Sequence, residues 1–150
     1  DVLLAYSGSE LVGTAAAWDQ KSFRQSLVTG YNRRLALFRL PYNVIARLLR
    51  YPILPRPGTY LDYINLSLIC ILKDDPRVFV ALLAEVIRRY RSHYPLLMAG
   101  LHERDALLPV LRQYRHFAYP SRLYVVCWED GEEDFENLDG RVPYLELGAL

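Results

Sequence analysis

The succession of a strand, a helix and a second strand between residues 60 and 101 restricts the fold of this chain more than any other feature. Residues 60–72, YLDYINLSLICIL, form the longest strand candidate. Their nearly continuous apolar second half is typical of a strand that is covered on both faces. Residues 95–101, PLLMAGL, form a second and shorter buried strand candidate.

The segment between these two strands predicts an amphipathic helix. Asp75 is suited to the N-cap position and Pro76 to the first helical position. The expected apolar face comprises Phe79, Leu82, Leu83, Val86, Ile87 and Tyr90. Strand, crossover helix and strand together predict a parallel βαβ unit, which is right-handed in nearly all known cases.

The N-terminal residues predict a β-hairpin. Residues 2–7 and 11–18 read as two strands, and the short turn between them contains Gly8. Gly13 and the run Ala15–Ala17 give the second strand small side chains. We therefore expect another element to pack closely against it.

Residues 32–51 place apolar side chains at helical spacing with arginines between them. Pro41 interrupts this run, which predicts two short helices or one bent helix. Such a piece can cover the domain's own sheet, or it can lie on a membrane surface or a partner. We favour the first alternative, because so much of the chain needs covering.

The C-terminal third predicts a helix over residues 105–114, a strand over 121–128, an acidic loop, and a last strand over 142–147. Pro109 is tolerable only in the first turn of that helix. The complete order predicts an α+β (α/β) fold, with a mixed central sheet, helices on both faces and one parallel βαβ unit. With 150 residues, of which 52% are hydrophobic, we expect a single globular domain spanning residues 1–150.

Targeting signals are not recognisable in the sequence. No apolar run approaches the roughly 20 residues that cross a bilayer, and no secretory signal pattern opens the chain. We therefore expect a soluble, cytoplasmic protein without a membrane span. The chain enters strand-like sequence directly after Asp1, which suggests a fragment of a longer protein. Cys70 and Cys127 lie in apolar runs, and we expect both to be reduced core residues.

Charge is distributed unevenly along the chain. Residues 21–61 contain no acidic residue but eight basic ones: Lys21, Arg24, Arg33, Arg34, Arg39, Arg47, Arg50 and Arg56. Residues 129–139 contain no basic residue but seven acidic ones: Glu129, Asp130, Glu132, Glu133, Asp134, Glu136 and Asp139. The two segments can face each other or be solvated separately, or the basic one can form an anion-binding face for phosphates, lipid or nucleic acid.

Several common kinds of site are not indicated. His93, His102 and His116 lack metal-ligand spacing with one another or with the cysteines, so we expect no metal site. The sequence has no G-x-S-x-G, Walker or dinucleotide-binding pattern, and no RNA-binding signature. Nucleic acid is the partner we least expect, because of the acidic segment.

Three stretches carry a resemblance to a known family: ELVGTAAAWDQ (residues 10–20), ALLAEVIRR (81–89) and DALLPVLRQYRHFAYPSRLYVV (105–126). Together with the order of the elements, they resemble the GCN5-related N-acetyltransferase (GNAT) superfamily from its second strand to its end. The resemblance covers essentially the whole chain. It implies a divergent member whose first strand and helices would precede Asp1.

The resemblance implies an acyl-CoA-dependent N-acyltransferase. The strands ending near Leu72 and Leu101 would form a V that receives the pantetheine arm of acetyl-CoA, and an amine of a small molecule or peptide would attack the thioester. A backbone amide near Ile71 or Leu72 would stabilise the oxyanion. The implied cofactor-binding edge comprises Ile71, Leu72, Lys73, Arg77 and Val78. The general base, the acyl acceptor and the oligomeric state are left open.

Two departures from the family pattern favour an alternative function. Where the family has Arg/Gln-x-x-Gly-x-Gly/Ala at the pyrophosphate, this chain has Asp74, Arg77 and Phe79; where the family has an Asn and a catalytic Tyr, it has Asp105 and Arg112. The remaining candidates for protonating the thiolate are Tyr114, Tyr119 and Tyr124. The alternative is a catalytically degenerate binding or interaction module that uses its basic face.

Overall fold

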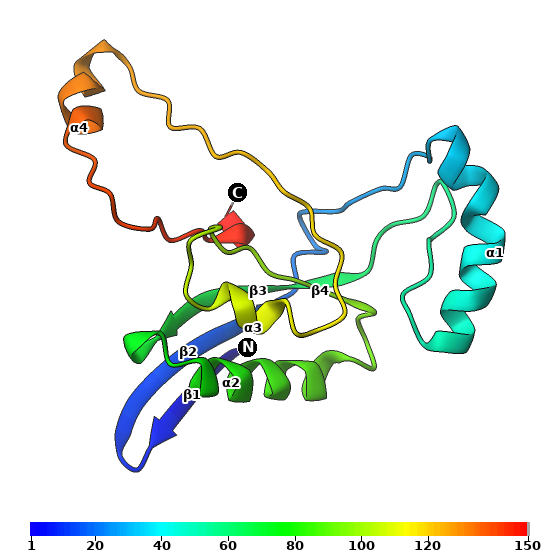
Figure 1. Cartoon of the computed structure of the whole chain (residues 1–150), viewed down its shortest axis with the longest axis horizontal. Helices are drawn as coiled ribbons and strands as arrows, with labels where there is room; N and C mark the ends of the chain where they lie inside the picture. The colour runs from blue at the N-terminus through cyan, green and yellow to red at the C-terminus, as the bar shows by residue number, and fades with distance from the viewer. Residues whose placement is uncertain (150) are drawn as a thin grey trace. The chain divides into compact units, whose positions relative to one another are not determined.

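A computed structural model describes residues 1–149 and shows an α+β protein with a four-stranded mixed sheet (Figure 1). The chain divides into two compact units. The first comprises residues 1–100 together with the segment that begins at Glu146, and the second comprises Leu101–Leu145. The sheet belongs to the first unit.

The sheet has the strand order β1-β2-β3-β4. Its strands are β1 (Val2–Ser7), β2 (Glu10–Trp18), β3 (Tyr63–Ile71) and β4 (Leu96–Met98). The first two pairings are antiparallel, whereas β3 and β4 are parallel. The predicted hairpin and the predicted parallel βαβ unit are therefore both present. Gly8, at the hairpin turn, has a φ of 62°, a conformation that glycine adopts without a steric penalty.

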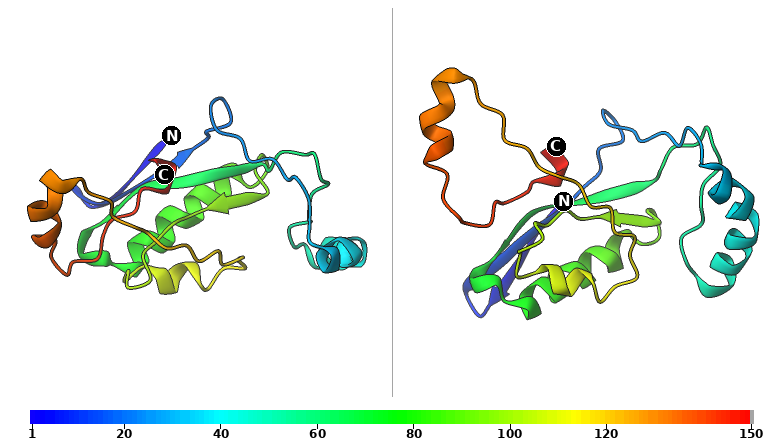
Figure 2. Two further views of the ribbon diagram at one scale, coloured as in Figure 1. Left: turned by 90° about the horizontal axis from the view of Figure 1, so that it is seen from above. Right: turned by 45° about the horizontal axis from the view of Figure 1, so that its top comes forward.

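Helix α2 (Pro76–Tyr90) connects β3 to β4 and lies along one face of the sheet (Figure 2). It begins as predicted, because the Asp75 side chain accepts a hydrogen bond from the Arg77 amide and Pro76 occupies the first turn. Its buried side chains are Phe79, Leu82, Leu83 and Val86. Phe79 thus belongs to the core, as its position on the predicted apolar face indicated.

The small side chains of β2 allow α2 to approach closely. A Cβ atom added at Gly13 would lie 2.7 Å from Val78 Cγ1 and 3.0 Å from Ile71 Cδ1. Ala15, Ala16 and Ala17 are buried. The expectation that another element packs closely on this strand is confirmed.

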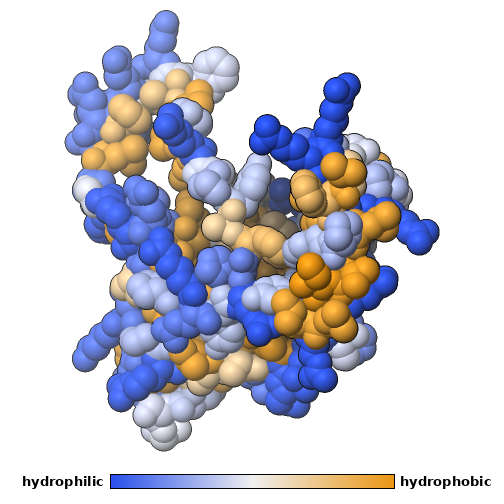
Figure 3. Space-filling view, turned by 45° about the vertical axis from the view of Figure 1, so that its right-hand side comes forward, coloured by the Kyte–Doolittle hydropathy of each residue, from blue (hydrophilic) through white to orange (hydrophobic). Residues whose placement is uncertain are grey.

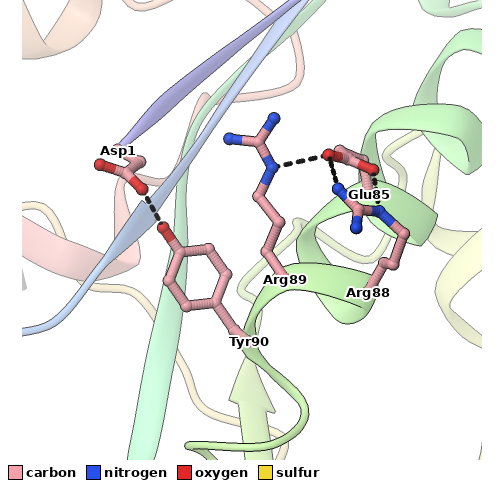
Figure 4. A network of polar contacts seen from close by, with 5 residues as sticks. All are labelled: Asp1, Glu85, Arg88, Arg89 and Tyr90. Carbon is pink, nitrogen blue, oxygen red and sulfur yellow. Dashed lines mark hydrogen bonds and ion pairs between the residues drawn. The ribbon is translucent and has the colours of Figure 1, made fainter.

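Charged and polar contacts surround the C-terminal half of α2 (Figure 4). Glu85 forms ion pairs with Arg88 and Arg89, at 2.7 and 2.6 Å, and these hydrogen bonds lower the pKa of Glu85 to about 2. The Tyr90 hydroxyl donates a hydrogen bond to the Asp1 carboxylate. These contacts lie at the surface, so their main effect is to orient side chains rather than to stabilise the fold.

Helix α1 (Arg33–Leu49) is one helix that continues through Pro41, so the expected alternative of two short helices is wrong and a single helix is present. Asn32 caps it by accepting a hydrogen bond from the Leu35 amide at 2.8 Å. We expected α1 to cover the sheet, and this was wrong: within residues 1–149, the helix that packs along the sheet is α2.

The reason is the proline-rich connector that follows α1. The Asn43 side chain both donates to the Leu54 carbonyl and accepts from the Leu54 amide, at 2.9 and 2.8 Å. Tyr42 donates to the Pro52 carbonyl, and Ala46 is the buried residue of α1. The polar inner face of α1 is thus used to hold the connector, and most of its large apolar side chains are left exposed.

The second unit contains little regular structure. It comprises α3 (Leu108–Leu111), the 3₁₀ turn η2 (Glu129–Gly131) and α4 (Glu132–Glu136). The helix predicted over 105–114 is only four residues long, although Pro109 does lie in its first turn. The acidic segment, expected to be a loop, contains η2 and α4.

Neither of the two predicted C-terminal strands is formed. Residues 121–128 have no regular structure and are exposed, and the segment 142–147 ends in the 3₁₀ turn η3 (Leu147–Ala149) instead. A strand requires a partner for its backbone groups, and the sheet ends at β4, which has three residues. Cys70 and Cys127 are unpaired as expected, but both are exposed, so their assignment to the core was wrong.

The face of the sheet opposite α2 is contacted by η3. A Cβ atom added at Gly148 would lie 2.7 Å from Trp18 Cε3 and 2.9 Å from Ser67 Oγ. Trp18 and Ser67 alternate along their strands with Ala17 and Leu66, and therefore point away from the face that α2 covers. Helices on both faces were expected, but in the first unit a single 3₁₀ turn takes this position.

Candidate functional site

A β-bulge in β3 is the most unusual backbone feature of the sheet. Thr14 pairs with Cys70 and Ala16 pairs with Ser67, so two residues of β3, Leu68 and Ile69, lie opposite one residue of β2. Leu68 has a φ of 51°, in the left-handed region. For a leucine this conformation costs on the order of 1–3 kcal/mol, and such strain concentrates at functional sites.

The bulge removes both backbone groups of Leu68 from the strand ladder. The Leu68 amide donates a hydrogen bond to Glu146 Oε2 at 2.8 Å, and the Leu68 carbonyl accepts one from Thr14 Oγ1 at 2.9 Å. The amide therefore points at a negatively charged oxygen outside the sheet. A backbone amide in this arrangement can bind an anionic oxygen of a ligand in the same way.

Strands β3 and β4 pair only over a short distance. Tyr63, Ile64 and Asn65 pair with β4, whereas β3 continues to Ile71. The edge of β3 that faced β4 is consequently free of this partner from Leu66 onward, and the bulge lies in that free part. In parallel sheets, ligands bind outside the carboxyl ends of the strands, and this bulge lies beyond the carboxyl end of β4.

Buried polar side chains line the sheet face next to the bulge. Asn65 Nδ2 donates to Gln20 Oε1 at 3.1 Å, and Gln20 Nε2 donates to the Gly148 carbonyl oxygen. Ser67 is 2% exposed, and its hydroxyl has no hydrogen-bond partner within residues 1–149. Leaving a buried hydroxyl unpaired costs about 1–3 kcal/mol. Ser67 is thus a polar group that a ligand can satisfy.

The segment that begins at Glu146 occupies this region. One carboxylate oxygen of Glu146 accepts from the Leu68 amide and the other accepts from the Gly148 amide at 3.1 Å. The side chain of Leu147 lies against Gly100, just after β4. A carboxylate supplied by the chain itself therefore holds the bulge amide.

The five residues expected to bind the cofactor lie around the junction of β3 and α2: Ile71 ends β3, Leu72 and Lys73 lie in the turn, and Arg77 and Val78 lie in the first turn of α2. The junction includes the 3₁₀ turn η1 (Leu72–Asp74), in which Lys73 and Asp74 have φ values of 55° and 50°. Ile71 is buried, Leu72 and Lys73 are exposed, and Val78 is half-buried beneath Gly13. The structure brings these residues together, but they face different ways. Leu72, Lys73 and Arg77 are exposed to solvent, whereas Ile71 is buried in the core.

The N-terminus of α2 is already occupied by a carboxylate. Asp75 accepts hydrogen bonds from both the amide and the guanidinium of Arg77, with the shortest ion-pair distance at 2.7 Å. These contacts lower the pKa of Asp75 to about 2. A pyrophosphate at this helix terminus would compete with Asp75 for the same donors.

The expected candidates for catalytic acid, Tyr114, Tyr119 and Tyr124, all lie in the second unit. Tyr114 is half-buried, whereas Tyr119 and Tyr124 are exposed in residues without regular structure. Asp105 accepts a hydrogen bond from the Leu107 amide at 2.8 Å, so it caps the turn before α3.

Two hollows in the first unit are too small to be the main ligand site. Their volumes are about 190 and 130 Å³, whereas sites for drug-sized ligands measure about 300–1,000 Å³. The larger hollow contains Lys21 and Asp62, whose 2.8 Å ion pair raises the pKa of Lys21. Lys21 and Asp62 therefore already satisfy each other.

Sequence reasoning placed the oxyanion donor near Ile71 or Leu72 and did not identify Gln20, Ser67 or Glu146. One signal was available, because Asn65 and Ser67 are polar residues at alternate positions of an otherwise apolar strand. Alternate positions share a face, so this pattern indicated a polar site on one side of the sheet. Glu146 gave no such signal.

Comparisons of the chain with protein-family models, with curated proteins and with solved structures gave no match. Among the described residues, none of the helices has both the length and the hydropathy needed to cross a membrane. Residues 1–149 also contain no cluster of histidine, cysteine and carboxylate side chains that could hold a metal ion.

Proposed function

We propose that this protein is a divergent member of the GNAT superfamily that transfers an acetyl group from acetyl-CoA to an amine, and that it acts in the cytoplasm. The observation that carries this proposal is the Leu68 bulge. It presents a strained backbone amide, held by a carboxylate oxygen, at the free edge of β3 beside the parallel strand β4. The resemblance of the sequence to this superfamily supports the same conclusion.

In this mechanism the thioester carbonyl of acetyl-CoA lies at the bulge. Attack by the amine forms a carbon–nitrogen bond and a tetrahedral oxyanion, which accepts a hydrogen bond from the Leu68 amide in place of Glu146. The intermediate collapses as the carbon–sulfur bond breaks and CoA leaves as the thiolate. Leu68 thus takes the role that sequence reasoning gave to Ile71 or Leu72.

Two side chains next to Leu68 have roles in this scheme. The displaced Glu146 carboxylate accepts the proton from the attacking amine. The Ser67 hydroxyl donates a hydrogen bond to a polar group of the bound cofactor, which satisfies the buried donor. The thiolate takes a proton from solvent.

The β3–α2 turn predicts weak binding of the cofactor. The proposed cofactor-binding edge comprises Ile71, Leu72, Lys73, Arg77 and Val78. In the free protein, however, Arg77 is paired with Asp75. The pyrophosphate must separate this exposed pair before it can use the Arg77 guanidinium. We therefore propose that the dissociation constant for acetyl-CoA lies in the micromolar range and is not lower.

Calorimetric titration with acetyl-CoA and with CoA tests this function. Saturable micromolar binding supports it, as does a loss of affinity in Arg77→Glu, which removes the cation at the pyrophosphate position. Arg104→Glu, a charge change in the second unit, is the matched control. Absence of binding to both ligands would contradict the proposal.

A second candidate function is a binding module that keeps the fold without the chemistry. The specific observation in its favour is α1, whose exposed apolar side chains are accompanied by arginines and by no acidic residue. The occupied N-terminus of α2 also agrees with a protein that has lost the pyrophosphate site.

A further inference from the structure

The face of α1 that points away from the connector is formed by large aliphatic side chains. Leu37, Leu40, Val44 and Leu48 follow one another at helical spacing and are between 58% and 80% exposed. We call these four residues the α1 stripe. It is about 16 Å long at 1.5 Å per residue. Figure 3 shows hydrophobic surface gathered on the side of the molecule that carries α1.

Arginines flank the α1 stripe at both ends. Arg33 and Arg34 lie in the first turn of α1, Arg47 lies in the last turn, and Arg50 is the C-cap. None of these four forms an ion pair with a carboxylate in the part of the chain that the structure describes. Residues 21–61 contain no acidic residue at all. The charge next to the stripe is therefore of one sign.

We propose that α1 binds the surface of an anionic phospholipid bilayer. The α1 stripe enters the boundary between headgroups and acyl chains, and the arginines at both ends contact lipid phosphates and carboxylates. This inference gives the second candidate function, the binding module, its partner. It does not depend on acyl transfer, because it uses no residue of the β3 bulge.

The shape of α1 favours a bilayer over a folded partner. The α1 stripe is an exposed ridge on one side of the helix. A protein would need a matching apolar groove with acidic groups at both of its ends. A fluid bilayer accepts a ridge without a preformed groove, and it offers anionic headgroups on every side. Charge complementarity thus selects an anionic lipid surface.

The connector prepares α1 for this role. Asn43 and Tyr42 bind the connector from the inner face, and Asn32 caps the first turn. Many surface-active segments fold only when they bind, at a cost in conformational entropy. Because α1 is already helical, binding does not carry this cost, and the α1 stripe is presented before the bilayer is reached.

The test is co-sedimentation of the full chain with vesicles of phosphatidylcholine alone and of phosphatidylcholine mixed with phosphatidylserine. The wild type binds the mixed vesicles, binds phosphatidylcholine much less, and is released by high salt. The double variant Leu37→Glu/Leu48→Glu loses about tenfold or more in affinity, because it places charges in the apolar boundary. Arg33→Gln/Arg34→Gln loses about tenfold on mixed vesicles only.

The matched control is Leu123→Glu/Val126→Glu, which places two charges at exposed residues of the second unit. It leaves vesicle binding unchanged. All variants alter exposed positions, and circular dichroism verifies that they are folded. If the wild type does not bind mixed vesicles, the proposal is overturned. That result is expected where another partner, either a protein or the chain's own acidic segment (residues 129–139), covers the α1 stripe. Equal losses in control and stripe variants also overturn it.

A titration of the same preparation with acetyl-CoA separates the two functions. Vesicle binding without cofactor binding leaves this inference standing and removes the acyltransferase. Cofactor binding without vesicle binding does the reverse.

Discussion

Leu68 is a γ-branched residue in a conformation that glycine normally adopts, and its amide binds a side chain instead of the neighbouring strand. Strain of this kind persists only where the surrounding structure enforces it. Here the enforcement comes from two side chains, since Thr14 holds the Leu68 carbonyl and Glu146 holds its amide. The bulge is therefore built by residues far apart in the sequence.

Replacement of Leu68 by glycine tests whether the bulge is strained. We expect Leu68→Gly to raise the free energy of unfolding by up to about 1 kcal/mol, because glycine adopts positive φ without steric penalty and the leucine side chain is half exposed. Urea denaturation measures the difference. Leu66→Gly, at a buried position of the same strand, should destabilise by several kcal/mol. If Leu68→Gly lowers the free energy of unfolding as much as Leu66→Gly does, Leu68 is not strained.

Ser67 provides a prediction with opposite signs for stability and binding. Ser67→Ala removes a buried hydroxyl that has no partner in residues 1–149, so we expect the free energy of unfolding to rise by about 1 kcal/mol. Affinity for acetyl-CoA should fall in the same variant. Asn65→Ala is the control, because it leaves Gln20 without its donor and should destabilise. A destabilised Ser67→Ala would mean that this hydroxyl already has a partner.

The Asp75 carboxylate predicts an acid-dependent step in stability. Its pKa is lowered from 3.8 to about 2, chiefly by the Arg77 side chain. Because the folded pKa is the lower one, the contribution of Asp75 is present above pH 3.8 and is lost as the pH falls toward 2. In Asp75→Asn, the free energy of unfolding should depend less on pH over this window, as measured by denaturation curves at successive pH values. An unchanged pH profile would refute the pairing in solution.

At the scale of elements, α2 and the hairpin were predictable because their signals are local. The N-cap Asp75, the adjacent Pro76 and the periodic apolar face all lie within one segment. The strands predicted over 121–128 and 142–147 failed because strand formation depends on a partner that periodicity does not reveal. For the site, the 71–78 turn was predictable as a contiguous segment, whereas Gln20 and Gly148 are 128 residues apart.

The contact between β2 and α2 predicts a steric limit at Gly13. Gly13→Ala should lower the free energy of unfolding by about 1–3 kcal/mol, because the new methyl group would lie 2.7 Å from Val78 Cγ1. Thermal or urea denaturation measures the loss. Gly30→Ala is the control, since nothing lies within 4 Å of a Cβ atom at that position.

The source of that loss can be identified with a double mutant. Val78→Ala shortens the side chain that Gly13→Ala would meet. The combined variant should therefore be less destabilised than the sum of the two single variants. Strict additivity would indicate that Gly13 is required for another reason.

At the scale of the whole molecule, the chain combines two compact units with an uneven distribution of charge. The first unit carries the bulge, the β3–α2 turn and the basic helix α1, and the second carries the acidic segment. The residues of the proposed acyl site and those of the α1 stripe do not overlap. Each function can consequently be removed by substitution without touching the residues of the other.

The most direct test of the acyltransferase is nuclear magnetic resonance of the chain labelled with ¹⁵N-leucine, titrated with acetyl-CoA. If the bulge binds the thioester carbonyl, the Leu68 amide should show one of the largest shifts, because the ligand replaces Glu146 as its acceptor. A shift of Leu72 with Leu68 unchanged would return the oxyanion donor to the β3–α2 turn. No shift at either amide would contradict acyl-CoA binding and leave the binding module as the function of this fold.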